Sequence, residues 1–175
     1  MVELVTARLR LRRWREADVG AMAAINADPE VMRWIGDGSV FDHAATTAEI
    51  AAFEQVWQSY GFGRFAVEIR DTGDLAGFTG MAIPEDVPDV MPAVEIGWRL
   101  GRPYWGRGLA TEAAQAALQF AFTGGGLDRV VGIHVVGNDS SARVMLKLGM
   151  HFERETSDIV YGRALHVYAI NRGER

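Results

Sequence analysis

The alternation of apolar and polar residues predicts four strands in the first hundred residues. In segments 8–14 and 64–70, apolar side chains occupy every second position, which is the period of a half-exposed strand. The turn residues at 71–74 predict that segment 75–83 returns beside 64–70 as a hairpin. A proline-marked loop then leads to a fourth strand at 93–100.

Longer spacings predict the helices. Apolar residues three and four positions apart favour helices at 16–27, from about 43 onward, at 109–122 and at 139–148. The side chains that the second of these should bury are Ile50, Phe53, Trp57 and Tyr60. Asp28 and Pro29 supply the cap and the first-position proline of a further short helix.

The order of these elements predicts the fold class. A nearly continuous apolar run at 130–136 is typical of a strand covered on both faces, and two last strands are expected at 151–158 and 165–170. The pattern favours a mixed α+β fold, with one central, mostly antiparallel sheet of about seven strands and helices on both faces. The 175 residues, 49% hydrophobic and 23% charged, fit one globular domain over 1–175.

Composition narrows the chemistry. With no cysteine, the chain has no disulfide, no thiolate metal site and no cysteine nucleophile. No metal is expected, because His43, His151 and His166 lack metal-like spacing. The net charge of -5 argues against a nucleic-acid partner, so the arginines between 8 and 15 should form a solvated strand face. Without a signal peptide or a long apolar stretch, we expect a cytoplasmic protein with no membrane partner.

The segment 95–112 holds a candidate anion site. A strand ends, Gly106 and Gly108 bracket Arg107, and a helix begins at once. Glycines allow the backbone to approach a ligand closely, and the first turn of a helix leaves N–H groups unpaired, which suits a phosphate. The segment lacks the Gly-Lys-Ser/Thr of a P-loop, and Asp128 precedes the next strand, which argues against a dinucleotide fingerprint. A glycine turn that binds nothing is the alternative.

Three segments carry a resemblance to a known family. The stretch 104–113, Tyr-Trp-Gly-Arg-Gly-Leu-Ala-Thr-Glu-Ala, resembles the cofactor loop of the GNAT acetyltransferases, with Trp105 where the family pattern has Gln or Arg. Segment 138–150 is similar to the Asn-x-x-Ser-x-Arg helix of the RimJ/RimL-like branch, which includes the ribosomal-protein N-terminal acetyltransferases. Segment 6–12 resembles the first strand of that branch. The similarity covers nearly the whole chain.

The resemblance implies an N-acetyltransferase with acetyl-CoA as co-substrate. It implies the GNAT fold, in which the fourth and fifth strands, here 93–100 and 130–136, splay apart around acetyl-CoA. Backbone groups near Leu100 would then hold the pantetheine as an added strand would. The residues assigned to the pyrophosphate are Arg107, Gly108, Leu109, Ala110 and Thr111. Asn138 would bind near the thiol end, and Arg143 would meet the phosphates or form a surface salt bridge. Related enzymes often dimerise, so a homodimer is one expected assembly.

Transfer to a primary amine needs a base and a proton for the leaving thiolate. Without cysteine, direct attack in a ternary complex is the expected route. Glu95 matches the family's glutamate and is the candidate base, acting directly or through water; alternatively it pairs with Arg99 or positions the backbone. Ser141 is the candidate acid because Met145 fills the slot where other members carry tyrosine; alternatively Ser141 caps its helix.

The acceptor side is the less defined part. Trp34, Phe41 and Tyr104 are candidate walls, and His134 is expected to line the acceptor channel, although all four residue types are also common in cores. A protein N-terminus, an amino acid, an aminoglycoside and a polyamine remain open as acceptors. A CoA-binding sensor module that has lost turnover is the competing function, whereas motif order argues against a nucleotide-binding oxidoreductase.

Overall fold

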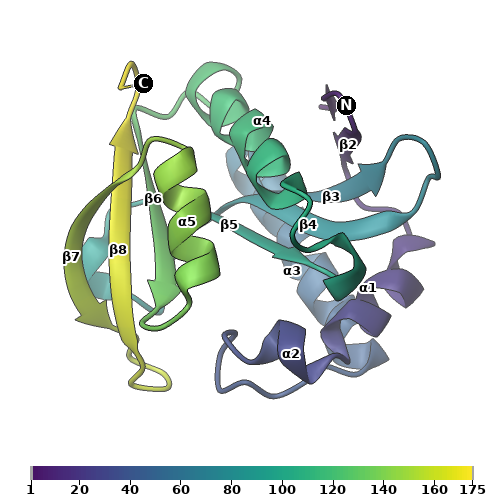
Figure 1. Ribbon diagram of the computed structural model, residues 1–175. Helices are drawn as coiled ribbons and strands as arrows, with labels where there is room; N and C mark the ends of the chain where they lie inside the picture. Colours follow the sequence, from purple (N-terminus) through teal and green to yellow (C-terminus); the bar gives the residue numbers. More distant parts are fainter. Residues whose placement is uncertain (1, 175) are drawn as a thin grey trace.

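An eight-stranded sheet runs through residues 2–174, which the computed structural model describes (Figure 1). The strands are β1 (Leu4–Val5), β2 (Leu9–Arg12), β3 (Arg64–Ile69), β4 (Leu75–Ala82), β5 (Glu95–Leu100), β6 (Arg129–Val135), β7 (His151–Ser157) and β8 (Ala164–Asn171). Their order in the sheet is β1-β2-β3-β4-β5-β6-β8-β7. Only the β5–β6 pair is parallel, so the mixed, mostly antiparallel fold is confirmed.

The sheet has one strand more than expected. β1 spans two residues, Leu4–Val5, and pairs with β2 in antiparallel register. So short a strand cannot generate a recognisable period of two, which is why the pattern misses it. The hairpin of β3 and β4 forms as expected around the turn at 71–74.

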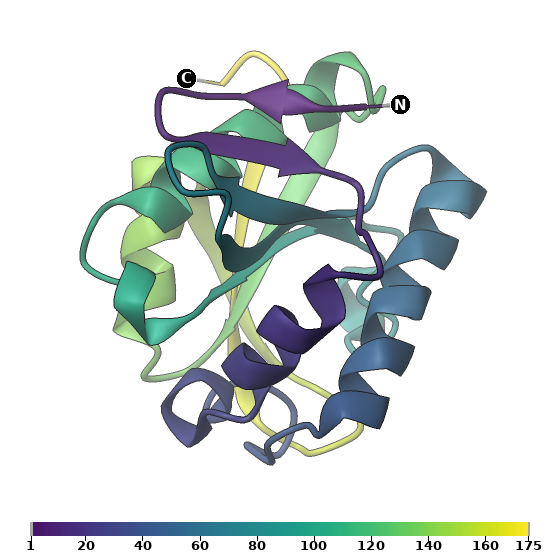
Figure 2. The same cartoon turned by 90° about the vertical axis from the view of Figure 1, so that its right-hand side faces the viewer.

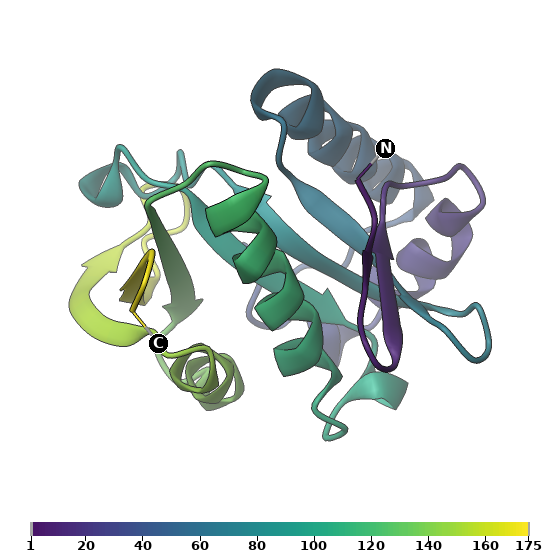
Figure 3. The same cartoon turned by 90° about the horizontal axis from the view of Figure 1, so that it is seen from above.

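Five α-helices flank the sheet. They are α1 (Asp18–Asn26), α2 (Pro29–Met32), α3 (His43–Tyr60), α4 (Leu109–Thr123) and α5 (Asp139–Lys147), with short 3-10 turns at Pro88–Val90 and Arg102–Tyr104. Helices α1 and α3 lie on one side of the sheet and α4 on the other (Figures 2 and 3). None of the helices within residues 2–174 is long and apolar enough to cross a bilayer.

The helix ends follow the sequence signals. Asp28 accepts a hydrogen bond from the Glu30 N–H at the start of α2, directly before Pro29. Helix α3 buries three of the four apolar residues expected to face inward, but Tyr60 is 53% exposed and stacks on Phe62 at the end of the helix. The expectation for Tyr60 was wrong because the helix stops there, at Gly61, before its face can return to the sheet.

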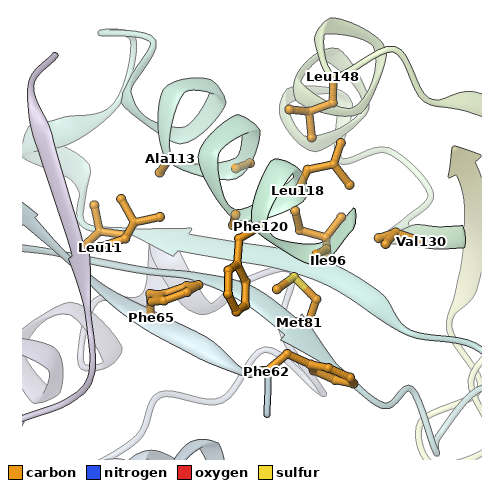
Figure 4. Close-up of a cluster of buried hydrophobic side chains, with 14 of the residues drawn as sticks. Leu11, Phe62, Phe65, Met81, Ile96, Ala113, Leu118, Phe120, Val130 and Leu148 are labelled. Carbon is orange, nitrogen blue, oxygen red and sulfur yellow. The ribbon is translucent and has the colours of Figure 1, made fainter. Parts of the chain in front are cut away.

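The main core lies between α4 and the sheet (Figure 4). Alanines at 113, 114, 117 and 121 are fully buried and let the helix backbone approach the strands closely. Phe65, Met81 and Ile96 fill the space below, and the ring of Phe120 reaches down between them. Burial of such side chains contributes roughly 1.5–3 kcal/mol each.

The expectation that the arginines between 8 and 15 form a solvated face was wrong for Arg12, whereas Arg8, Arg10 and Arg15 keep exposed side chains. Arg12 is only 5% exposed, and its guanidinium donates to Asp18 at 2.7 and 2.8 Å and to Glu68 at 2.7 Å. The ion pairs raise the pKa of Arg12, and the hydrogen bond with Arg12 helps hold the pKa of Asp18 below its ordinary range despite burial. Asp18, at the start of α1, and Glu68, on β3, therefore contact the Arg12 guanidinium in place of water.

The strands β5 and β6 separate almost as soon as they meet. Their only register partners are Glu95 and Val131, joined by a hydrogen bond from the Val131 N–H to the Val94 carbonyl at 2.9 Å. Beyond that point the two strands diverge, and β6 continues with β8 instead. The splay expected between 93–100 and 130–136 is therefore present.

Candidate active site

A cavity of about 700 Å³ occupies the gap between the diverging strands. Its walls come from α2 and the loop behind it, strands β3 to β6, the segment 104–111, α5 and the β7–β8 loop. The candidate site residues meet in this one cavity except Arg107 and Phe41, which do not line it. Phe41 instead lies beside Arg99, whose guanidinium carbon is 6.0 Å from the centre of the Phe41 ring.

The loop before α4 presents an open helix terminus to the cavity. Gly106 and Gly108 have φ of 70° and 74°, a left-handed conformation that strains any residue with a Cβ. No side chain caps α4, and the N–H groups of Leu109, Ala110 and Thr111 have no acceptor within residues 2–174. Together with the helix dipole, these groups form an anion-binding site.

The same loop is held from both ends. The Trp105 indole N–H donates to the Leu100 carbonyl at 2.7 Å, so the residue that departs from the family pattern ties the loop to β5. Arg8 donates to the Arg107 carbonyl at 2.8 Å and pairs with Glu112 at 2.6 Å. The main chain of Arg107 is therefore fixed from outside the cavity.

The start of α5 forms the opposite wall. Asn138 caps the helix, since its Oδ1 accepts from the Ser141 N–H at 3.4 Å and from the Ser140 hydroxyl at 2.8 Å. The Asn138 Nδ2 donates to the Ser141 Oγ at 3.3 Å, a weak contact that leaves the hydroxyl proton of Ser141 free. The cap is thus provided by Asn138, and Ser141 lines the cavity. Arg143 lies exposed on the same wall and forms no ion pair within the described chain.

Glu95 lies where the two strands part. Its side chain is partly exposed to the cavity and makes no hydrogen bond with any described residue. Burial raises the pKa of Glu95 to about 7, an effect that the Arg64 charge opposes and the Asp86 charge reinforces. Glu95 does not pair with Arg99, because Arg99 is engaged elsewhere: it contacts Glu49 at 2.9 Å and donates to the Asn26 Oδ1 at 2.7 Å.

Two arginines lie on the cavity floor: Arg99, expected only as a partner of Glu95, and Arg64, which the sequence pattern did not identify. Arg99 is 6% exposed and lies 4.9 Å from the centre of the Phe78 ring. Arg64, from β3, approaches the same ring to 4.9 Å and the Phe53 ring to 5.0 Å. Burial lowers the pKa of Arg99, and the Arg64 charge adds to that effect. The only sequence signal for the position of Arg64 is the alternation of β3: its side chain lies on the opposite face of the strand from Phe65, which faces the core.

His134 and the aromatic walls occupy the remaining sides. The His134 Nδ1 lies 2.9 Å from the Val135 carbonyl; since a carbonyl only accepts, Nδ1 carries the proton and Nε2 is a buried acceptor without a partner in residues 2–174. Burial lowers the pKa of His134, which favours the neutral ring. Trp34 and Tyr104 line the cavity as expected.

Comparisons with known proteins identify the kind of chain that forms this site. Residues 8–151 match the family described as acetyltransferase (GNAT) domain. The uncharacterized N-acetyltransferase YnaD of Bacillus subtilis is 31% identical over 152 residues, which cover 87% of this chain and 84% of that protein. A crystal structure of an acetyltransferase from Agrobacterium tumefaciens C58 is 27% identical, with a TM-score of 0.82, covering 98% of this chain and 95% of that one.

A more distant structure shares the fold alone. It is RimL, a ribosomal L7/L12 alpha-N-protein acetyltransferase in complex with coenzyme A, and is 17% identical. Its TM-score is 0.78, over 97% of this chain and 98% of that chain.

Proposed function

The chain belongs to the family of GNAT acetyltransferase domains and is an acetyltransferase, and on that premise we propose that it acetylates a primary amine by direct attack in a ternary complex. Acetyl-CoA supplies the acetyl group as a thioester. The observation that carries the proposal is one cavity that joins the open N-terminus of α4 to Glu95. We also place the chain in the RimJ/RimL-like branch, on its motifs at 104–113 and 138–150.

The residues present fit acetyl-CoA. The free N–H groups of Leu109, Ala110 and Thr111 suit the pyrophosphate, and Arg143 on the facing wall adds a charge. The edge of β5 beyond Glu95 has no β6 partner. The pantetheine amides can therefore pair with this edge in the way that a neighbouring strand would. The Leu100 carbonyl already accepts a hydrogen bond from Trp105. We therefore assign the binding of pantetheine to the backbone groups of β5 that precede Leu100 as well as to Leu100.

Glu95 is proposed as the general base. An amine attacks only after losing its ammonium proton, and a carboxylate whose pKa is about 7 is matched to that transfer near neutral pH. Glu95 also faces the cavity and makes no competing hydrogen bond within residues 2–174. It takes the proton directly or through a water molecule.

Ser141 is proposed as the acid for the leaving thiolate. Its Oγ accepts from Asn138, so its own proton points to other acceptors, and it lines the cavity on the α5 side. Met145 is 1% exposed, packs against Gly132 and has no proton to donate. Within this helix the hydroxyl nearest the family's tyrosine position is therefore Ser141.

Thiol release tests the proposal. We would incubate the protein with acetyl-CoA and a panel of amines and detect free CoA with a thiol reagent; the chain has no cysteine, so it contributes no background. We expect amine-dependent release above the rate of acetyl-CoA hydrolysis. Binding of CoA without turnover of any amine would instead support a CoA-binding module.

A further inference from the structure

The cavity floor holds a cation that the acetyl-transfer chemistry does not use. Arg64 is in register with Gly80 of β4, and Gly80 is in register with Gly97 of β5. Two neighbouring glycines carry no side chains, so the guanidinium of Arg64 lies across them towards β5. A Cβ built at Gly97 would lie 3.7 Å from the Arg64 Nη2 and 3.9 Å from the Glu95 Oε1. The guanidinium and the proposed base therefore flank the same small space.

The charge on Arg64 has no carboxylate within 4.0 Å among residues 2–174. Its side chain forms neither an ion pair within 4.0 Å nor a hydrogen bond, and its Nε is buried without a partner. The neighbouring Arg99 differs, because Glu49 neutralises its charge and Asn26 accepts a hydrogen bond from it. The rings of Phe53 and Phe78 hold the Arg64 guanidinium in place but accept no strong hydrogen bond. Such a preorganised fork suits the two oxygens of a carboxylate.

We propose that Arg64 binds a carboxylate of the acceptor while the acceptor's amine faces Glu95, so that the acceptor is a small zwitterion of the amino-acid class. This assignment rests on the proposed function. The amine and the carboxylate must be close together in the molecule, because Glu95 and Arg64 border one space over Gly97. Asp86, whose charge acts on Glu95, adds attraction for the ammonium end.

The rim of the cavity favours a small acceptor over a polypeptide. Trp34 reaches across to the β6–α5 loop, where its ring lies 3.5 Å from a Cβ built at Gly137. Arg163, from the β7–β8 loop, donates to the carbonyls of Gly36 at 2.8 Å and Arg33 at 3.3 Å. The loop after α2 is thus fastened to the β6–α5 loop and to the β7–β8 loop. The α2 loop and the β7–β8 loop both lie at the foot of Figure 2.

Matched acceptors test the assignment. We would measure kcat/KM for α-amino acids and for their amides, in which an uncharged carboxamide replaces the carboxylate and the ammonium is more acidic. For the best acceptor, the wild type should prefer the acid at least about tenfold, as expected for a charge-assisted hydrogen bond. Arg64→Met should lower kcat/KM for the acid about 10- to 100-fold and for the amide less than about threefold. Arg64→Lys should restore part of the preference.

Arg13→Met is the matched control. Arg13 also lies over an aromatic ring, 4.9 Å from the centre of Trp57, but it pairs with Glu54 and does not line the cavity. The Arg13→Met variant should leave the ratio of kcat/KM for the acid to kcat/KM for the amide unchanged. Thermal unfolding of each variant with CoA checks that the fold and the co-substrate half are intact.

The outcomes separate the two proposals. Equal kcat/KM for acid and amide in the wild type overturns the carboxylate site whether or not Arg64→Met folds. So does an equal loss on both acceptors in a folded Arg64→Met, or a peptide N-terminus that is acetylated better than every free amino acid. If only amines that lack a carboxylate are turned over, the carboxylate site is overturned but the acetyltransferase proposal stands. No turnover of any amine overturns the proposed function itself.

Discussion

The two halves of the cavity are built in different ways. The half assigned to acetyl-CoA consists mainly of backbone groups from contiguous segments, the open terminus of α4 after Gly108 and the capped start of α5 at Asn138. The acceptor half consists of side chains, Arg64, Glu95 and Trp34, brought together from β3, β5 and the loop after α2. The first half is therefore encoded locally, whereas the second exists only once the sheet register is set.

The difference predicts that acceptor-side changes abolish chemistry without affecting co-substrate binding. Glu95→Gln should lower kcat/KM about 100-fold or more, because general-base catalysis contributes roughly 10²–10⁴-fold. Stabilisation by CoA, measured by thermal unfolding, should match that of the wild type. A variant that keeps more than a tenth of the wild-type rate would remove Glu95 from the role of base.

The pH profile provides a second test of the acceptor half. Because the pKa of Glu95 is raised to about 7, the carboxylate predominates only above that pH. The value of kcat/KM should fall about tenfold per unit below pH 7 and level off above it, until the acceptor's own ionisation intervenes. A rate that is flat from pH 5.5 to 7.5 would contradict the role of this carboxylate.

The co-substrate half should respond to backbone changes. Gly108 has φ of 74° and space around it, so Gly108→Ala introduces mainly backbone strain at the mouth of α4. Strain of roughly 1–2 kcal/mol should raise KM for acetyl-CoA about 5- to 30-fold.

Gly126→Ala is the control for that change. Gly126 has φ of 67°, has nothing within 4 Å of a built Cβ, and lies in the loop after α4, away from the cavity. It should cost similar stability in urea unfolding and leave KM for acetyl-CoA unchanged. Equal effects of the two alanines on KM would show that Gly108 has no special part in binding.

The smallest effect is expected at the boundary between the halves. Ser141→Ala removes the proposed proton donor but keeps the Asn138 cap, because the cap uses the backbone N–H of residue 141. We expect kcat to fall about 3- to 10-fold, as for the loss of one hydrogen bond. Single-turnover kinetics would show whether the chemical step slows; an unchanged step would assign the proton to water.

The fold was largely readable from the chain because its signals are local. The periods of α3 and the hairpin at 71–74 lie within short windows, and so do the cap at Asp28 and the glycines before α4. The error at Arg12 has a tertiary cause. The alternating period of the strand does not show that Asp18, at the start of α1, and Glu68, on β3, fold against the Arg12 guanidinium.

The candidate site shows the same difference between residues identified by a local sequence signal and residues that only the folded sheet brings together. The motif at 104–113 was recognised together with the candidate base, Glu95, and both now line one cavity. Arg64 was missed because its place beside Glu95 depends on the register of Arg64, Gly80 and Gly97 across three strands. That register is a property of the folded sheet, and no window of the sequence contains it.

Ligand-dependent thermal unfolding tests the central claim, that this cavity is an acetyl-CoA site, most directly. The purified protein would be heated separately with acetyl-CoA, CoA, NAD and ATP. At about 100 times the dissociation constant, acetyl-CoA and CoA should each stabilise the folded state by roughly 2.7 kcal/mol, and NAD should not. No stabilisation by either CoA species, or stabilisation by NAD in their place, would contradict the account.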